Sequence, residues 1–215
     1  MHKAIGKARS KVLFFLLLLF SNLSTALTIG ALPALEFGMG FADAWTNTQS
    51  TATGYHNGWN VSAEANWIFR ISLDNKDIHN AGKEIPPPVS IILSPGFHAQ
   101  YIGMSASNWL SDGSRYRAWS AIGLGPELDF GLEFVDSIMV HKNSLLFSIS
   151  YLANFANYTQ TTLYSAYNSW VLKVSWNTRI DHNTAFFAAL PLEYAFRADG
   201  KSILSGLVMG IRYEF

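Results

Sequence analysis

Apolar residues recur at every second position through eight successive segments of this 215-residue chain, and this alternation restricts the possible folds more than any other feature. An extended strand points successive side chains to opposite faces, so a period of two predicts strands with one apolar face. No long segment places its apolar residues at helical spacing. We therefore expect an all-β fold whose strands lie within residues 35–45, 59–73, 89–101, 116–134, 145–155, 170–178, 186–196 and 203–215.

The first 26 residues follow a different pattern. Four basic residues precede an unbroken apolar run of nine residues at 12–20, and the small residues Ser24, Thr25 and Ala26 come after it. This order is typical of a secretory signal peptide, and the run is shorter than the roughly 18 to 20 residues that a spanning helix needs. We predict that residues 1–26 are removed, with cleavage after Ala31 as the alternative, and that residues 27–215 form one domain.

Composition excludes several classes of function. Removing residues 1–26 leaves 11 basic against 15 acidic residues, so no basic face indicates binding to nucleic acid. The chain has no cysteine, which excludes disulfides, thiolate metal sites and a lipidated cysteine. Charged residues make up only 14% of the chain, against about a quarter in soluble domains. Much of its apolar surface is therefore expected to face something other than water.

A membrane accounts for this surface. In hydrocarbon every backbone polar group must be paired, which only helices and closed barrels achieve. Alternating segments of about ten residues separated by polar turns are typical of a transmembrane barrel. We predict an eight-stranded antiparallel up-and-down transmembrane β-barrel. The polar connections 46–58, 105–115, 156–169 and 197–202 are expected outside the cell, with shorter turns at 135–144 and 179–185 and an unusually long one at 74–88 on the periplasmic side.

The chain ends with the sequence GLVMGIRYEF, in which Met209, Ile211, Tyr213 and Phe215 alternate with other residues. With the signal peptide and the eight segments, this ending resembles the small eight-stranded bacterial outer-membrane proteins of the OmpA, OmpX and OmpW type. The resemblance implies an outer-membrane location and gives these four residues the role of a signal for the barrel-assembly machinery. The partners we expect are outer-membrane lipid and an extracellular ligand or host factor at the loops, and the barrel is expected to be a monomer.

The opposite face of the alternating strands predicts what fills the barrel. An eight-stranded barrel is just wide enough for side chains to fill, and ionic groups confined there should pair. We therefore expect a membrane scaffold or surface-interaction protein with a largely plugged lumen and no enzymatic activity. The predicted lumenal charge network comprises Glu36, Glu64, Arg70, His98, Arg117, Glu127, Asp129, Glu133, Lys173, Arg179, Glu193, Arg212 and Glu214.

An alternative is a narrow channel for small hydrophobic solutes, with which OmpW-type barrels are associated. Several inward positions are apolar and could line such a path, although they could equally fill space near the barrel ends. They are Ile68, Ile92, Trp119, Leu146, Leu152, Phe187, Leu204 and Val208.

A second alternative is a lipid A-modifying enzyme, since some barrels of similar size carry a His, a Ser and an acidic residue near the outer rim. Here the expected loops offer His56 with Ser111, Asp112 and Ser114, within sequences that are ordinary for loops. We assign no catalytic residue and no cofactor. No two histidines lie two to four positions apart, so spacing indicates no metal site either.

Aromatic residues cluster toward the expected strand ends, which predicts the two girdles of a spanning barrel. The outer set is Trp45, Trp59, Tyr101, Tyr116, Trp170, Tyr194 and Phe196, and the inner set is Tyr213 and Phe215, whereas Trp67 and Trp176 fall nearer mid-strand. Pro95 and Pro126 interrupt two segments. A hairpin centred near Leu110 would place them roughly opposite each other, where we expect them to share one β-bulge.

Overall fold

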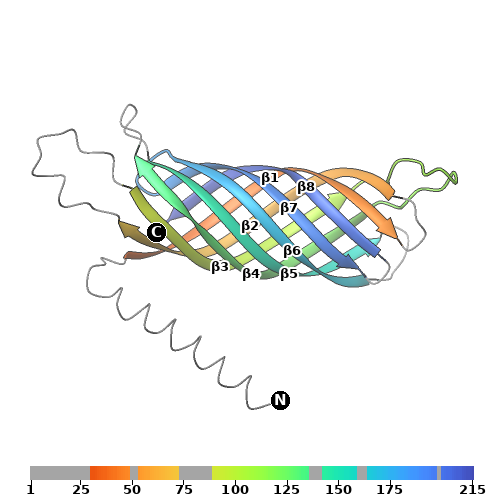
Figure 1. The fold of residues 1–215 in the computed structure, drawn as a ribbon, viewed down its shortest axis with the longest axis horizontal. Coiled ribbons are helices and arrows are strands. Elements are labelled where there is room, and N and C mark those ends of the chain that lie inside the picture. Colours follow the sequence, from red (N-terminus) through yellow and green to blue (C-terminus); the bar gives the residue numbers. More distant parts are fainter. Residues whose placement is uncertain (1–29, 49–52, 73–88, 136–141, 159–163, 198–199) are drawn as a thin grey trace, which may run out of the picture.

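The alternating segments form eight strands in the computed structural model, which describes residues 30–48, 53–72, 89–135, 142–158, 164–197 and 200–215. Every strand pairs antiparallel with its neighbours, and β1 pairs with β8, so the sheet closes into a barrel (Figure 1). The predicted fold class is confirmed. The strands are β1 (Gly30–Thr48), β2 (Thr53–Ser72), β3 (Val89–Met104), β4 (Trp119–Val135), β5 (Lys142–Tyr158), β6 (Tyr164–Arg179), β7 (Thr184–Arg197) and β8 (Gly200–Glu214).

The side-chain parity predicted for each strand is also confirmed. Phe37, Met39 and Phe41 on β1 are more than half exposed on the outer surface, whereas Glu36 before them and Ala42 after them are buried. The same alternation continues around the barrel through every strand. A continuous apolar outer surface of this size is unfavourable in water and matches the hydrocarbon-facing band of a membrane barrel.

The barrel has two openings, which the ends of β1 and β8 distinguish. The amide of Phe215 donates a hydrogen bond of 2.9 Å to the carbonyl of Pro33, so the end of β8 lies beside the start of β1. We name this end the C-terminal mouth; β2, β4 and β6 also end there, and β3, β5 and β7 begin there. We name the other end of the barrel the opposite mouth. Among the described residues, no helix is long and apolar enough to cross a membrane.

Several strands run further than the sequence predicted. β1 continues to Thr48 and β2 begins at Thr53, so most of the expected loop 46–58 is strand, and β5 and β6 likewise take up most of 156–169. The apolar alternation missed these extensions because residues beyond the lipid need no apolar outer face. The predicted signal peptide and the long turn at 74–88 lie outside the described residues.

Pro95 and Pro126 lie roughly opposite each other, as expected, but they do not share a bulge. Pro126 is opposite Phe97, and Pro95 is opposite Leu128, within an unbroken β3–β4 ladder. Each proline instead coincides with a gap in the ladder to the strand on its other side, and the register is the same before and after each gap. Since proline only lacks the N–H donor, losing ladder bonds on one side is enough to accommodate it.

The aromatic residues form pairs on the outer surface near both mouths. Trp45 contacts Tyr55, Trp59 contacts Tyr101 and Tyr151 contacts Trp170, with centroid separations of 4.9–5.6 Å. Three aromatic residues lie at positions that differ from the prediction. Tyr116 precedes β4 and stacks on buried His56, so it belongs to the interior of the opposite mouth. Trp67 and Trp176 lie near the C-terminal mouth, because β2 and β6 end only a few residues later.

Candidate functional site in the barrel lumen

Twelve of the thirteen charged residues predicted for the lumen point inward, and ten of these twelve are at least nine-tenths buried. The exception is Arg117. This residue is exposed in the connection that precedes β4, which begins at Trp119. The prediction for Arg117 was wrong because the parity of β4 was extended across residues 116–118, where the chain has left the sheet.

The ammonium group of Lys173 is the centre of the ionic cluster in the middle of the lumen. Its Nζ contacts a carboxylate oxygen of Glu64, lies 3.1 Å from Glu127 Oε1 and lies 3.8 Å from Glu36 Oε1. His98 Nδ1 is 3.7 Å from the same Glu127 oxygen and 3.3 Å from the hydroxyl of Ser150. The inward parity of β1, β2, β3, β4 and β6 thus brings groups from distant parts of the sequence into contact.

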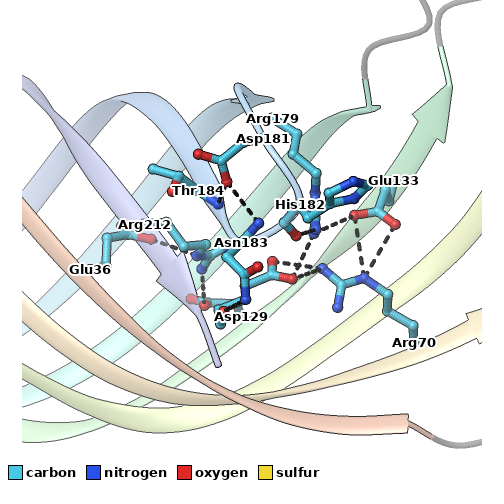
Figure 2. Close-up of polar contacts among 11 residues, drawn as sticks. Glu36, Arg70, Asp129, Glu133, Arg179, Asp181, His182, Asn183, Thr184 and Arg212 are labelled. Carbon is cyan, nitrogen blue, oxygen red and sulfur yellow. Dashed lines mark hydrogen bonds and ion pairs between the residues drawn. The ribbon is translucent and has the colours of Figure 1, made fainter.

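Arg212 extends this cluster toward the C-terminal mouth. Its Nε is 2.8 Å from Glu36, and its Nη2 is 3.4 Å from Asp129. Asn66 donates a 3.2 Å hydrogen bond to the same oxygen of Asp129. Figure 2 shows Arg212 between Glu36 and Asp129. Buried charges of this kind are tolerated only when opposite charges and hydrogen bonds compensate for their lost hydration.

Three side-chain contacts run straight across the barrel. In a closed ring of eight strands, strands four apart in the order lie on opposite walls. Lys173 on β6 reaches Glu64 on β2, Arg212 on β8 reaches Asp129 on β4, and Gln100 on β3 reaches Glu193 on β7. These side chains therefore occupy the lumen from wall to wall.

A second ionic cluster lies at the C-terminal mouth (Figure 2). Arg70 Nε lies 3.2 Å from Glu133, and its Nη2 lies 2.7 Å from Glu214. Arg179 contacts the same two carboxylates, at 2.6 Å from Glu214 and 3.7 Å from Glu133. Two guanidinium groups thus bridge two carboxylates, which is a strong, directional arrangement for arginine.

The β6–β7 turn is fastened to this cluster. Asn183 Nδ2 donates to the carbonyl of Glu214 at 2.6 Å, and Arg179 donates to the carbonyl of His182 at 2.6 Å. Asp181 accepts from the backbone amides of Asn183 and Thr184, and these bonds hold the pKa of its carboxyl below the ordinary value. Beside the turn lies a cavity of ≈ 230 Å³, lined by Leu32, Arg70, Lys142, Arg179, His182, Asn183, Glu214 and Phe215.

The inward apolar residues fill the spaces between the polar clusters. Phe187 on β7 is fully buried against Val208, and Gly38 and Gly210 leave room for its ring. A Cβ at Gly38 would lie 2.7 Å from Phe187 Cζ and 2.6 Å from Val208 Cγ1. Near the C-terminal mouth, Ala34, Ile68, Ile92 and Leu146 form another packed cluster. The largest apolar cluster comprises Ala42, Ala44, Ile102, Met104, Trp119, Ala121, Ala156, Tyr167, Ala195 and Leu204.

The residues considered for a catalytic His–Ser–acid group do not lie in one exposed site. His56 was expected in a loop but is buried inside β2, with its Nδ1 2.8 Å from the carbonyl of Ser105 and its ring against Trp119. Ser114 and Asp112 are exposed in the β3–β4 connection, where the Ser114 hydroxyl donates to Asp112 at 2.6 Å.

The sequence analysis did not include the uncharged polar residues of the lumen. Gln100 donates to Glu193 at 2.8 Å, and Asn154 donates to Ser169 at 2.8 Å. Their inward parity was visible in the alternation, but only ionic residues were considered for the network. The parity of a strand therefore identifies lumenal polar residues whether or not they are charged.

The closed ladder, the apolar outer surface and the ion-paired interior define this protein as an eight-stranded transmembrane β-barrel of the outer-membrane type. No protein-family model matches the sequence, and no curated protein matches it. Among solved structures, Neisserial surface protein A is 12% identical, with 85% of this chain and 99% of that chain covered and a TM-score of 0.46.

Two further solved structures resemble the chain at low identity. Ail of Yersinia pestis, in complex with the heparin analogue sucrose octasulfate, is 12% identical over 84% of this chain and 99% of its own, with a TM-score of 0.32. The outer-membrane protease OmpT of Escherichia coli is 7% identical over 89% of this chain and 99% of its own, with a TM-score of 0.39.

Proposed function

We propose that this protein is an outer-membrane scaffold whose lumen is closed and whose surface connections interact with extracellular partners. The observation that carries the closed lumen is the set of three wall-to-wall contacts made by Lys173, Arg212 and Gln100. Each joins strands on opposite walls, and all six side chains involved are at least nine-tenths buried. A continuous water path would have to pass through these contacts.

The same packing argues against a path for hydrophobic solutes. All eight inward apolar residues considered for such a path are buried, seven of them within the packed clusters. Phe187 lies against Val208 at the level of Gly38 and Gly210, where a solute would need space. The arrangement of the eight inward apolar residues supports a space-filling role.

The closed lumen is tested by reconstituting the purified chain in planar lipid bilayers. We expect no stable ionic conductance from the wild-type protein. A variant that combines Gln100→Ala, Lys173→Ala and Arg212→Ala shortens all three cross-lumen side chains, and it should conduct once its folded state has been verified. A conducting wild-type barrel, or a folded triple variant that stays closed, would each contradict the proposal.

The β3–β4 connection supports the surface-interaction part of the proposal. Its backbone continues to pair with β2, since Ser105 donates to the Asn57 carbonyl at 2.9 Å and Asn108 to the Tyr55 carbonyl at 3.0 Å. Trp109 remains 67% exposed, with the guanidinium of Arg115 4.9 Å from its ring centroid. An ordered, exposed tryptophan and arginine are residue types that recur at the centres of binding interfaces.

Membrane orientation is tested by labelling with a membrane-impermeant maleimide, because the chain contains no cysteine of its own. Ser111→Cys places a thiol in the β3–β4 connection, and His182→Cys places one in the β6–β7 turn, at positions that are both exposed. On intact cells we expect Ser111→Cys to be labelled and His182→Cys to be labelled only after lysis. The reverse pattern would rule out a surface role for the β3–β4 connection.

A further inference from the structure

We propose that the middle of the lumen binds one divalent metal ion through Glu64, His98 and Glu127. One ligand atom from each residue lies within 4.8 Å of the others. His98 Nδ1 is 3.9 Å from Glu64 Oε1 and 3.7 Å from Glu127 Oε1. Tetrahedral zinc, with bonds of about 2.0 to 2.2 Å, places its ligand atoms about 3.4 Å apart, so both histidine–carboxylate distances are within roughly half an ångström of the distance that it needs.

The register of the strands builds this site. Glu64 on β2 is directly opposite His98 on β3. Glu127 on β4 is opposite Gly96, two positions from His98, and Gly125 is opposite His98 itself. The three side chains therefore come from consecutive strands on one wall and converge on the same part of the lumen.

Two independent features favour cation binding by these residues. All three residues are at least nine-tenths buried, and among the described residues His98 Nε2, Glu64 Oε2 and Glu127 Oε2 have no hydrogen-bond partner. A buried polar atom without a partner carries a desolvation cost that a bound ion would remove.

The second feature is an imbalance of charge. Among the residues that the structure describes, five buried carboxylates in this part of the lumen face two permanent cations, Lys173 and Arg212. Three negative charges remain unmatched, and protonation of His98 would offset only one. A divalent ion would supply the two further charges that side chains lack. The five carboxylates belong to Glu36, Glu64, Glu127, Asp129 and Glu193.

Lys173 is the competitor of this ion. Its ammonium contacts Glu64 and lies 3.1 Å from Glu127, so it occupies part of the space that a metal ion would take. Lysine has a flexible side chain, and its ammonium group lies 3.8 Å from Glu36 on β1. Glu36 therefore offers Lys173 an alternative partner. Metal binding should therefore displace this side chain, and removing its charge should strengthen binding.

The experiment uses tag-free protein refolded into detergent with excess Co²⁺ and separated from unbound metal by gel filtration. We expect about one cobalt per chain and the intense visible absorption of a four-coordinate N/O site. His98→Asn should lose both signals, His182→Asn should retain both, and Lys173→Met should bind at least tenfold more tightly. Each variant is first verified as folded by its heat-dependent gel migration.

Equal cobalt content in wild-type protein and His98→Asn would overturn the site. The site would also be overturned if folded Lys173→Met protein bound no more cobalt than His98→Asn. In that variant the competing ammonium group is removed, so an existing metal site should bind cobalt. In either case bound protons must offset the excess carboxylates.

Discussion

The side-chain amide of Gln100 on β3 donates a hydrogen bond of 2.8 Å to Glu193 on β7, the opposite wall of the barrel. Lys173 and Arg212 make contacts of the same kind further along the lumen. The barrel is thus held together by its backbone ladder around the circumference and by polar side chains across its diameter. Stability and closure of the lumen are consequences of the same contacts.

The first prediction concerns the closed ladder. Eight strands paired without an edge leave no starting point for stepwise unfolding, so the folded barrel should resist dodecyl sulfate at room temperature. We expect unheated protein to migrate differently from boiled protein on a denaturing gel. Identical migration of a sample that shows strand signal in circular dichroism would contradict a closed barrel.

Arg212→Met should destabilise the barrel strongly. The substitution leaves Glu36 and Asp129 buried without their guanidinium partner, and losing one member of a buried ion pair costs about 3–5 kcal/mol. Arg117→Met is the matched control, because Arg117 is exposed outside the strands and its loss should change stability by about 0.5 kcal/mol or less.

The measurement for both arginine variants is urea unfolding in lipid vesicles, monitored by tryptophan fluorescence. Equal destabilisation by the two substitutions would show that the ion pairs of Arg212 contribute nothing beyond a generic effect of removing a positive charge.

The two arginines also show which parts of the structure were accessible from sequence. Parity predicted the lumenal position of Arg212, because a strand has only two faces and the apolar one must meet lipid. The same rule failed for Arg117, since nothing in the alternation marks where the sheet ends. Strand ends beyond the lipid, as at Thr48 and Thr53, carry no apolar signal at all.

The sequence was equally unable to predict which lumenal side chains contact each other. Which lumenal charge meets which depends on the tilt and stagger of the strands, so Lys173 and Glu64 gave no sign of proximity across more than one hundred positions. The convergence of Glu64, His98 and Glu127 was missed for the same reason. Metal-site reasoning from the sequence considered spacing along the chain, whereas these residues lie on three strands.

Gly38→Val should destabilise the barrel by overpacking. Its Cβ would meet Val208 and Phe187 at 2.6 and 2.7 Å, and overpacking of a filled interior costs about 1–3 kcal/mol. Adding Phe187→Leu should recover part of the loss, giving a favourable coupling energy in a double-mutant cycle. Ala63→Val, on the outer face of β2, is the control and should have little effect. Additive effects of Gly38→Val and Phe187→Leu would show that the two positions do not compete for space.

The last prediction concerns acidification of the β3–β4 connection. Asp112 accepts hydrogen bonds from the hydroxyl and amide of Ser114, and these bonds lower the pKa of its carboxyl. Because the pKa is depressed in the folded loop, the contribution of these bonds is complete above the ordinary aspartate value of about 3.9 and is lost as pH falls through the lower folded value. We expect the ¹H–¹⁵N signal of Ser114 to titrate with a midpoint below about 3.9. The same titration should be absent in Asp112→Asn. A midpoint at or above the ordinary value would mean that Ser114 does not hold this carboxylate in solution, and the connection would then lack the order that our proposal of a surface-interaction site requires.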